Sequence, residues 1–417
     1  MNARSPVSTP AVRITQRAQR VEPFYVMELA KAASEMAAQA GPDQRPMIYL
    51  NIGEPDFTAP PLVQAAASRA IHDGRSQYTQ ATGLPALRRA ISGWYASRFG
   101  LDIDPQRIVV TAGASAALQL ACLTLIEAGD EVLMPDPSYP CNRQFVQAAE
   151  GRAVLLPSGP AERFQLSAAQ VEQAWGPATR GVLLASPSNP TGTSIARQEL
   201  ENIARFVRDR GGVTLIDEIY LGLSFDDAYG HSALGLPDGL GDEVISINSF
   251  SKYFNMTGWR LGWLVLPPAL VPVAERLAQN LFICASTIAQ HAALACFEPE
   301  SLAEYERRRA AFKTRRDYFI PELNRLGLTV PVVPDGAFYA WADVSALCER
   351  WGLQPATADR PEGGSWALAF ELMQRCQLAT TPGRDFGQAN PGRYLRFSTA
   401  SSMEQLREAV ARLEAAL

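Results

Sequence analysis

Short apolar runs alternate with amphipathic stretches along the middle of the chain, from about residue 107 to residue 267. The runs are continuous and rich in β-branched residues, which is typical of strands buried on both faces, and helical stretches between such strands indicate parallel βαβ crossovers. The pattern therefore predicts a doubly wound, mostly parallel α/β sheet, with clear helices at 115–129 and 197–212. Its expected strands are "RIVVTAG", "EVLMPDP", "AVLLPS", "GVLLASPSNP", "VTLIDEIY", "EVISINSF" and "LGWLVLP".

The pattern changes after Pro267 to long helices and then to short strands. The stretch 305–327 is expected to be a helix that links two domains, with its arginines on a solvated face. Beyond it we expect a small α+β unit. Its strands and its closing helix are expected at 328–334, 337–344, 393–400 and 402–417.

These patterns divide the chain into a large domain, a small discontinuous domain and an arm. Residues 60–300 are expected to form the large domain, and residues 21–59, which carry no sheet of their own, are expected to join residues 301–417 in the small one. Residues 1–20 contain four arginines and no acid, as in a transit peptide, but they have no clear amphipathic period and no apolar core. We therefore interpret them as a mobile N-terminal arm.

Composition limits the classes of function. The 417 residues exceed the usual size of one core, and 47% hydrophobic and 19% charged residues are ordinary for a globular protein. A net charge of -5 and a pI near 5.5 argue against a nucleic-acid partner, and no apolar run approaches the length of a membrane span. The six cysteines show no C-x-x-C spacing, so we expect no metal site and a reducing cytoplasm.

Several polar residues stand at the ends of the expected strands, where doubly wound sheets bind ligands. The strand "RIVVT" runs into Ala114 and Ser115 at the start of a helix, whose free amides could hold a phosphate or simply close a tight turn. Asp217, with Tyr220 three residues on, ends a buried strand and needs a partner, which by default is a helix cap or a salt bridge. Asn189 could donate to a ligand or stabilise a turn.

Lys252 follows the strand "EVISINSF" and is surrounded by Ser249, Ser251 and Arg260. A lysine is most often a solvated charge. Among apolar and hydroxyl neighbours at a strand end, however, its ammonium form is disfavoured and its amine becomes nucleophilic, as Schiff-base chemistry requires. The serines and Arg260 add donors for an anion. Together with the other strand-end residues, they supply the parts needed to hold pyridoxal phosphate.

Five motifs occur in an order that resembles a known family. They are "NIGEPDF", "SPSNPTG", "DEIY", "SFSKYFNMTGWRLGW" and "YLRFS". From about residue 21 to the C-terminus the chain resembles the class I/II aminotransferases of fold type I, the aspartate-aminotransferase-like enzymes. The resemblance implies a large doubly wound domain, a smaller α+β domain and pyridoxal 5'-phosphate as the cofactor.

The resemblance implies three catalytic residues. Lys252 falls on the lysine that forms the Schiff base with the cofactor. Once the substrate releases it, this lysine transfers the proton between the substrate Cα and C4′ of the cofactor. Asp217 matches the acid that keeps the pyridine nitrogen protonated, which would provide this buried carboxylate with its cation. Tyr220 and Asn189 match the two donors to the ring oxygen of the cofactor.

Further cofactor contacts are implied by the same resemblance. The phosphate would be held by the start of a helix and by a side-chain cradle, formed by Ala114, Ser115, Ser249, Ser251 and Arg260. Tyr139 falls where an aromatic ring stacks on the face of the cofactor. Tyr78 resembles a tyrosine that crosses a dimer interface to the partner's phosphate, which implies a homodimer with shared active sites.

The substrate site is implied by Arg396, Gly53 and Asn189. Arg396 lies in the apolar strand "RYLRFSTA", where an unpaired guanidinium would be costly. In the family this arginine grips the substrate carboxylate in a bidentate manner, and the default alternative is a structural salt bridge. Gly53 aligns with a glycine whose backbone contacts the same carboxylate, and Asn189 also lies at this site.

The chain lacks the basic residues that aspartate-specific relatives place near the substrate. Residues 278–286, "AQNLFICAS", contain no Lys or Arg, and Ser115 stands where some relatives have a lysine. We therefore expect transamination between a neutral or aromatic L-amino acid and a 2-oxo acid such as 2-oxoglutarate or pyruvate. Arg384 is left open, since it could bind an acidic group of the substrate or pair with Asp385.

Two other readings share the cofactor residues. A carbon-sulfur β-lyase, or another fold type I enzyme, would use the same constellation, because the choice of reaction depends on subtle placement. A non-catalytic regulator that senses pyridoxal phosphate is disfavoured, since some twenty residues before the resemblance are too few for a helix-turn-helix module and the pI is acidic.

Overall fold

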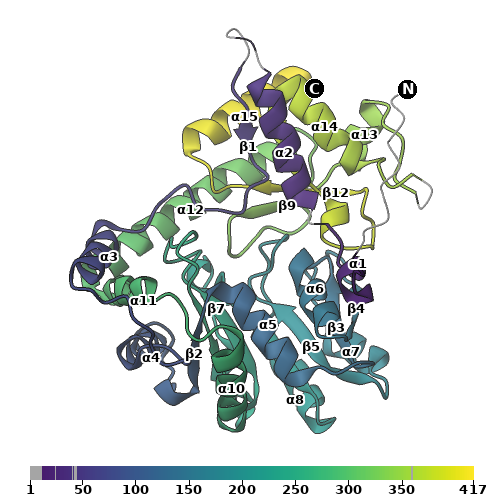
Figure 1. Cartoon of the computed structure of the whole chain (residues 1–417). Helices are drawn as coiled ribbons and strands as arrows, with labels where there is room; N and C mark the ends of the chain where they lie inside the picture. Colours follow the sequence, from purple (N-terminus) through teal and green to yellow (C-terminus); the bar gives the residue numbers. More distant parts are fainter. Residues whose placement is uncertain (1–11, 24, 40, 42–44, 358–359) are drawn as a thin grey trace.

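The computed structural model describes residues 12–23, 25–39, 41, 45–357 and 360–417. Its largest feature is a seven-stranded sheet with the order β2-β8-β7-β6-β5-β3-β4, in which β8 is antiparallel to both neighbours and the other pairs are parallel (Figure 1). All seven strands expected from the sequence are confirmed. They are β2 (Ile108–Thr111), β3 (Glu131–Asp136), β4 (Arg152–Pro157), β5 (Thr179–Ala185), β6 (Val213–Asp217), β7 (Ile245–Ser249) and β8 (Gly262–Val265).

Both faces of this sheet are covered, as continuous apolar strands require. Along β5, Val182 and Leu184 belong to one hydrophobic cluster and Leu183 to another on the opposite face. The first cluster includes side chains of α3, α4, α7, α8 and α11, and the second those of α5, α6 and α10. The helices around the sheet are α3 (Pro61–His72), α4 (Pro85–Phe99), α5 (Gly113–Leu125), α6 (Pro140–Ala148), α7 (Ala168–Ala174), α8 (Arg197–Asp209), α9 (Leu240–Glu243), α10 (Val271–Leu281) and α11 (Thr287–Leu294).

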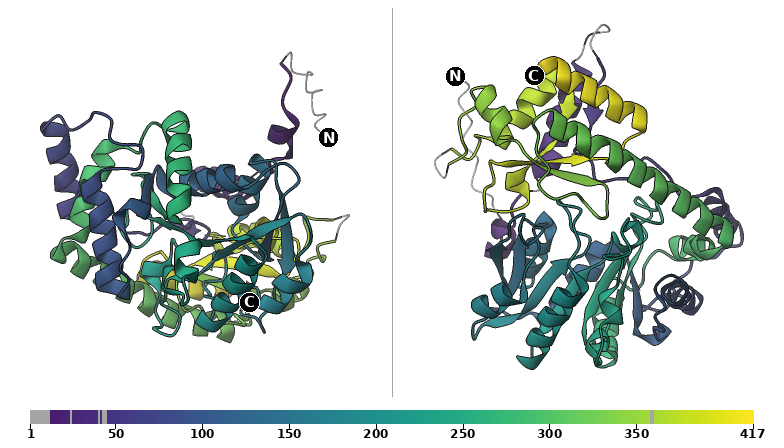
Figure 2. Two further views of the ribbon diagram at one scale, coloured as in Figure 1. Left: turned by 90° about the horizontal axis from the view of Figure 1, so that it is seen from below. Right: turned by 180° about the vertical axis from the view of Figure 1, so that it is seen from behind.

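A smaller α+β unit lies above the carboxyl ends of the parallel strands (Figures 1 and 2). It has an antiparallel sheet β11-β12-β9 and a parallel pair in which Ile48 of the N-terminal segment lies beside Leu378. Its elements are β1 (Ile48–Tyr49), α2 (Tyr25–Ala38), α12 (Pro299–Arg325), β9 (Tyr339–Asp343), α13 (Ser345–Arg350), α14 (Ser365–Cys376), β10 (Leu378–Ala379), β11 (Thr381–Pro382), β12 (Tyr394–Ser398) and α15 (Met403–Ala416).

The strand expected at 328–334 is wrong. Only Thr329 pairs there, in an isolated bridge to Asp343. Pro331 and Pro334 have no amide hydrogen to donate to a ladder, so the apolar pattern of this stretch does not become a strand.

The solvated arginine face expected on the long helix α12 is also wrong in part. Arg308 and Arg315 are buried. Arg308 donates to the Thr58 carbonyl, and both outer nitrogens of Arg315 reach the Asp56 carboxylate at 2.8 Å. These contacts tie α12 to the segment that follows Gly53, and a seven-residue spacing on a helix places both arginines on this face.

The N-terminal arm is described only from residue 12, and residues 1–11 lie outside the described chain. Its helix α1 (Gln16–Arg20) carries Arg17 and Arg20, which both form exposed ion pairs with Glu150. The division of the chain at residues 60 and 300 stays a prediction. No helix within the described ranges is both long enough and apolar enough to cross a membrane.

Candidate active site

A cavity of about 440 Å³ lies between the carboxyl ends of the large sheet and the small unit. Every site residue expected from the sequence lines it except Tyr78, whose side chain is 83% exposed in the loop between α3 and α4. The lining residues that were expected are Gly53, Ala114, Ser115, Tyr139, Asn189, Asp217, Tyr220, Ser249, Ser251, Lys252, Arg260 and Arg396.

Sheet register brings the strand-end residues together. Ala185, which precedes the loop of Asn189, is paired with Asp217, and Asp217 is paired with Ile247 near the end of β7. Lys252 follows β7 by three residues. Parallel strands end at the same edge of the sheet, so residues far apart in sequence face one cavity.

Lys252 is half-buried, and its Nζ donates to the Gly53 carbonyl at 2.7 Å. Burial lowers the pKa of Lys252 to about 8, because desolvation disfavours the ammonium form. The Glu54 carboxylate opposes this shift, and Arg396 and Arg260 add to it. The amine is therefore largely neutral, and nucleophilic, at pH values above 8.

Asp217 is a buried carboxylate that faces the cavity. One of its oxygens accepts the Ile219 amide at 3.1 Å, and within the described chain it forms no ion pair. Burial raises the pKa of Asp217 to about 7. The neighbouring Glu218 does not line the cavity, and its carboxylate accepts hydrogen bonds from Ser232, Ser246 and the Ala233 amide. Of these two acids, Asp217 is therefore the one that could pair with a cation in the cavity.

The other end of the cavity is suited to an anion. Ala114 and Ser115 lie in the first turn of α5, whose amides and dipole are positive. Arg260 points to the same place, since a Cβ on Gly113, which has a φ of +81°, would lie 2.6 Å from the Arg260 guanidinium. The hydroxyl of Ser249 accepts the Ser251 amide at 3.0 Å, which brings both serines to this end.

Arg396 of β12 is 3% exposed and forms no ion pair with any described residue. Its Nη1 donates to Asn189 Oδ1 at 2.9 Å, and its Nη2 donates to the Asn51 carbonyl at 2.6 Å and to Thr381 Oγ1 at 3.3 Å. The salt-bridge alternative for Arg396 is therefore wrong. A buried guanidinium without a carboxylate partner, at the wall of a cavity, is suited to binding a carboxylate ligand. Because Asn189 accepts from Arg396, its amide nitrogen remains available as a donor.

Tyr339 is a site residue that the sequence did not reveal. Its hydroxyl lies 2.6 Å from the hydroxyl of Tyr220, and its ring lies 4.5 Å from the guanidinium of Arg396. A Cβ on Gly53 would lie 2.3 Å from the Tyr339 hydroxyl, so no other residue fits at position 53 without displacing this tyrosine. "AFYAWADV" reads as a simple apolar strand, and nothing in its spacing singles out the tyrosine.

Other lining residues were also missed, and most are apolar. They include Val26, Met27, Ala30, Ile52, Leu118 and Ile219, with Glu54 as the acidic exception. Apolar residues carry no chemical signal of their own in a sequence, since the same residue types fill every core. Only their position relative to Lys252 and Arg396 marks them as part of the site.

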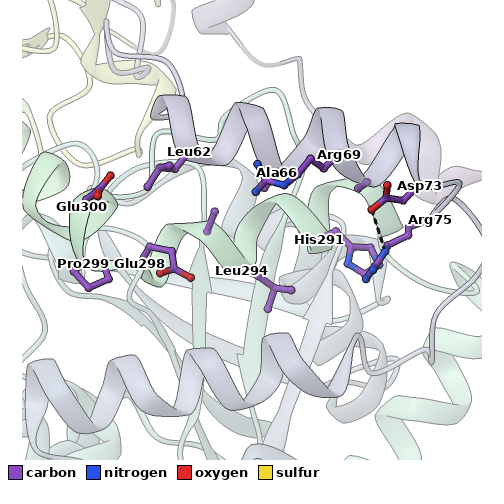
Figure 3. Close-up of a pocket in the computed structure, with 12 residues that line it drawn as sticks. Leu62, Ala66, Arg69, Asp73, Arg75, His291, Leu294, Glu298, Pro299 and Glu300 are labelled. Carbon is purple, nitrogen blue, oxygen red and sulfur yellow. Dashed lines mark ion pairs between the residues drawn. The ribbon is translucent and has the colours of Figure 1, made fainter.

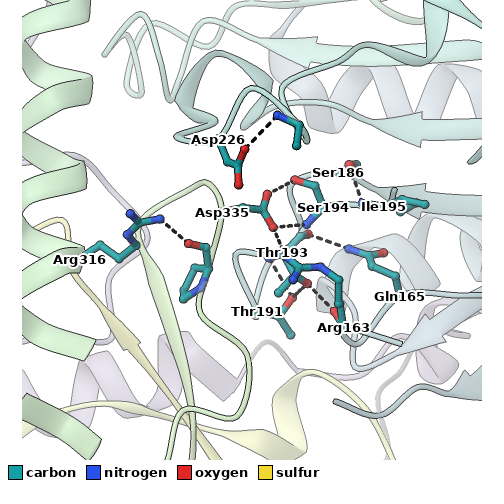
Figure 4. A network of polar contacts seen from close by, with 12 residues as sticks. Arg163, Gln165, Ser186, Thr191, Thr193, Ser194, Ile195, Asp226, Arg316 and Asp335 are labelled. Carbon is teal, nitrogen blue, oxygen red and sulfur yellow. Dashed lines mark hydrogen bonds and ion pairs between the residues drawn. The ribbon is translucent and has the colours of Figure 1, made fainter. Parts of the chain in front are cut away.

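A buried polar network fixes the loop that carries Asn189 (Figure 4). The Asp335 carboxylate accepts the Ser194 amide at 3.0 Å and the Ser194 hydroxyl, and it also pairs with Arg163. The backbone amide of Asp335 donates to the Gly192 carbonyl at 3.1 Å. The loop before β9 thus holds the loop that carries Asn189.

Arg384 takes neither of the roles left open by the sequence. It does not line the cavity, and it forms no ion pair with Asp385. Its guanidinium lies 4.5 Å from the ring of Tyr25 and 4.5 Å from the ring of Trp366. Residues 281–284 are also absent from the lining of this cavity within the described chain.

A second hollow, of about 570 Å³, lies between α3 and α11 (Figure 3). Its lining mixes apolar side chains such as Leu62 and Leu294 with charged ones, including Asp73 and Arg75, which pair at 3.9 Å. It contains none of the expected site residues. Within the described residues no group of three His, Cys, Asp or Glu side chains is arranged to hold a metal ion.

Comparison with known proteins decides the family. The model of the family "Aminotransferase class I and II" matches residues 45–413. The chain belongs to the class I and II aminotransferases. This confirms the resemblance drawn from the five motifs, and with it the fold class and pyridoxal phosphate as the cofactor.

The relatives of this aminotransferase cover nearly its whole length. A valine–pyruvate aminotransferase of Mycobacterium tuberculosis is 38% identical over 394 residues, which are 94% of this chain and 96% of that protein. The crystal structure of an aminotransferase from Mycobacterium tuberculosis has a TM-score of 0.88 at 36% identity, and covers 98% of this chain and 99% of that one. Thermus thermophilus aspartate aminotransferase with maleate has a TM-score of 0.86 at 30% identity, with 97% and 100% covered.

The residues of this aminotransferase fit its cofactor. Asp217 is a buried anion that lacks a counter-charge, as a protonated pyridine nitrogen would provide. At the opposite end, Arg260, two serines and the start of α5 offer donors for a phosphate dianion. Lys252 lies between them with a lowered pKa. The charges of the cavity are thus complementary to the two charged ends of pyridoxal phosphate.

The reactivity of Lys252 should show its lowered pKa. The chain has three lysines, and Lys31 and Lys313 are exposed and provide internal references. In cofactor-free protein, brief acetylation over pH 6.5 to 10.5 followed by peptide mass spectrometry should give a half-maximal reactivity of Lys252 near pH 8, because only the neutral amine reacts. A half-maximal value near that of a free lysine, about 10.4, would show that the cavity does not desolvate this amine.

Replacement of Arg396 should weaken carboxylate binding. In Arg396→Lys the planar fork is lost, so we expect KM for the amino acid to rise about tenfold to hundredfold, with a smaller change in kcat, in steady-state assays. Arg393→Lys, at an exposed position just before the same strand, is the matched control and should leave KM unchanged. An equal rise in KM for an amine without a carboxylate would contradict the assignment.

Proposed function

We propose that this aminotransferase takes the amino group from L-amino acids with neutral, apolar side chains. The observation that carries the proposal is the charge inventory of the cavity. Of the described residues that line it, three are basic, namely Lys252, Arg260 and Arg396. If Lys252 takes part in the reaction, Arg260 binds the phosphate and Arg396 binds the α-carboxylate, no basic residue of this lining is left to bind a second carboxylate of the substrate. An acidic side chain would then be desolvated without a partner.

The remaining wall supports the same donor class. Val26, Met27, Ala30 and Ile52 form an apolar part of the wall of the cavity that Arg396 and Gly53 also line. An aliphatic or aromatic side chain would bury its apolar surface against this wall, and this burial favours binding by about 25 cal/mol per Å². Alanine would bind with less of this contribution.

We infer that a monocarboxylic 2-oxo acid such as pyruvate is the preferred acceptor, by the same argument. The name of the valine–pyruvate aminotransferase relative is consistent with this choice. 2-Oxoglutarate, with its second carboxylate, is the alternative acceptor and would need a basic group from outside the described cavity.

The residues of the chain would divide the chemistry as follows. Pyridoxal phosphate, when bound, supplies a ring that accepts the electron pair left on the substrate Cα. Asp217 would hold a proton on the ring nitrogen, and the Tyr220 hydroxyl and the Asn189 amide would donate hydrogen bonds to the ring oxygen. Arg396 would orient the substrate through its carboxylate. Lys252 Nζ, beside Gly53, would take the proton from the substrate Cα as general base and return it to C4′ of the cofactor.

We also propose that the functional form is a homodimer. Tyr78 points away from its own cavity, and exposed apolar side chains occur on neighbouring elements, at Ile71, Leu123, Leu281 and Ile283. The loop of Tyr78 is tied to the start of α11 by a hydrogen bond from Thr287 to the Gln77 carbonyl. A second copy covering this surface would receive Tyr78 at its phosphate end, and residues 281–284 would approach its cavity.

A cytoplasmic location is consistent with the thiols. All six cysteines are free, and four of them are buried. Proteins in oxidising compartments tend to use such residues in disulfides, whereas the cytoplasm keeps them reduced.

The donor class can be tested on the purified yellow protein with single amino acids. Loss of the absorbance of the aldehyde form of the cofactor should be fast with leucine or valine, and at least about tenfold slower with aspartate at equal concentration, because the aspartate side chain lacks a basic partner. Aspartate reacting as fast as leucine would contradict the donor class. Release of pyruvate and ammonia from cystathionine would instead support a β-lyase, provided that alanine leaves the absorbance of the aldehyde form unchanged.

The shared site can be tested through Tyr78. Tyr78→Phe should weaken pyridoxal phosphate binding by about twofold to tenfold, measured by equilibrium dialysis, since one hydrogen bond to the phosphate is lost. Tyr318→Phe, which alters a tyrosine packed against the small-unit core, is the control. A monomer by light scattering, with cofactor affinity unaffected by Tyr78→Phe, would rule out the shared site.

A further inference from the structure

Helix α2 has one face in the core and another at the cavity. Leu29 and Ala33 are packed into the hydrophobic cluster of the small unit. Val26, Met27 and Ala30 line the cavity, and the first two lie in the first turn of the helix. Helix α2 packs beside β10, although the two elements come from opposite ends of the chain. The side of the cavity that would receive the substrate side chain thus depends on where this first turn lies.

Asp385 caps this turn from η6 (Gly383–Asp385). Its side chain is fully buried, and its two oxygens accept the amides of Tyr25 and Val26 at 3.2 and 3.1 Å. The Asp385 carbonyl in turn accepts a hydrogen bond from Arg143 at 3.1 Å. Burial raises the pKa of Asp385 to about 6, so the group is ionised at pH 7.5, and a carboxylate interacts favourably with the positive end of the helix dipole.

Arg384 contacts the same turn through the side chain of Tyr25. Its guanidinium lies 4.5 Å from the ring of Tyr25 and at the same distance from the ring of Trp366, the second residue of α14. The two rings also meet edge to face with centroids 5.8 Å apart. Cation–π contacts of this kind are strongest for a partly desolvated arginine, as Arg384 is here.

We propose that Arg384 and Asp385 are positioning residues that hold the first turn of α2 as the wall for the substrate side chain, and thereby determine selectivity for apolar amino acids. The inference rests on the proposed donor class. One residue fixes the backbone of the turn and the other fixes its first side chain, while neither touches the cavity. Their loss therefore displaces Val26 and Met27. Arg384 does this without a charge interaction at the site, whereas the Asp385 carboxylate also interacts electrostatically with Arg396.

The consequence is a selective kinetic effect. A long apolar side chain reaches the wall, whereas the methyl group of alanine does not depend on it. At pH 7.5 the variant Arg384→Gln should lower kcat/KM for leucine about fivefold to tenfold, mostly through KM, and change the value for alanine less than about twofold. Asp385→Asn also removes a negative charge that interacts with Arg396, so the expected result is a loss for leucine that exceeds the loss for alanine about fivefold to tenfold. The rest of α2 remains packed through Leu29 and Ala33, so the fold should persist.

Hydrogen exchange provides a readout that does not depend on any substrate. In the holoenzyme, mass spectrometry of peptides covering 25–38 should show exchange of the first-turn amides about fivefold to tenfold faster in Asp385→Asn, and unchanged exchange in the second half of the helix. The matched controls are Asp343→Asn and Arg393→Gln. Asp343 caps α13 through the Ser345 amide, and Arg393 lies over the Tyr394 ring, both away from the cavity.

The outcomes distinguish failure of the anchor, by which we mean Arg384 and Asp385 holding the first turn of α2, from failure of the proposed donor class. Unchanged exchange at 25–38 would overturn the anchor whichever amino acids react. Faster exchange with equal losses for leucine and alanine, or with losses matched by the controls, would overturn the selectivity role. If the wild-type enzyme rejects leucine and valine, the donor class fails, and the exchange experiment still decides whether Arg384 and Asp385 hold the turn.

Discussion

Two buried charges of opposite sign face one cavity, and neither has an ion-pair partner within the described chain. The carboxylate of Asp217 and the guanidinium of Arg396 are each almost inaccessible to solvent. Burying a charge without compensation costs several kcal/mol, and burial alone raises the pKa of Asp217 to about 7, so a ligand of opposite charge would stabilise each group in its charged form. The ring nitrogen of the cofactor would neutralise the first charge and the α-carboxylate of the substrate the second.

This constraint explains why the site needs both parts of the structure. Asp217 and Lys252 come from strand ends of a sheet covered on both faces, where little can move. Arg396 comes from a separate small sheet and reaches the same cavity through hydrogen bonds to Asn189 and the Asn51 carbonyl. The Asn189 amide, in the loop after β5 of the large sheet, thus contacts Arg396 of the small unit. One of its atoms accepts from Arg396, and the other is free to donate to the ring of the cofactor.

The sequence predicted the chemistry of the site better than its walls. Buried parallel strands have a strong local signal, because periodicity alone carries it, whereas the role expected for Lys252 came from the resemblance of five motifs to a known family. Tyr339 and Val26 have no such signal, since only the tertiary fold brings them to the cavity. The errors have the same origin. The apolar pattern at 328–334 was overridden by its prolines, and Arg315, which reads as a surface charge, is buried against a partner far away in sequence.

Reaction and selectivity are thus supported by different parts of the chain. The residues proposed to react lie at or just after the ends of strands whose displacement would disturb the main core. The proposed apolar wall is formed in part by the first turn of α2. Two hydrogen bonds and one ring contact from η6 hold this turn in place. Such contacts are each worth about 1 kcal/mol, far less than a buried strand. Substitutions at the wall or at its anchor can therefore alter which side chain is accepted at little cost in stability, while the cofactor site stays the same. This arrangement is consistent with a family whose members share one fold and carry names for different amino-acid substrates.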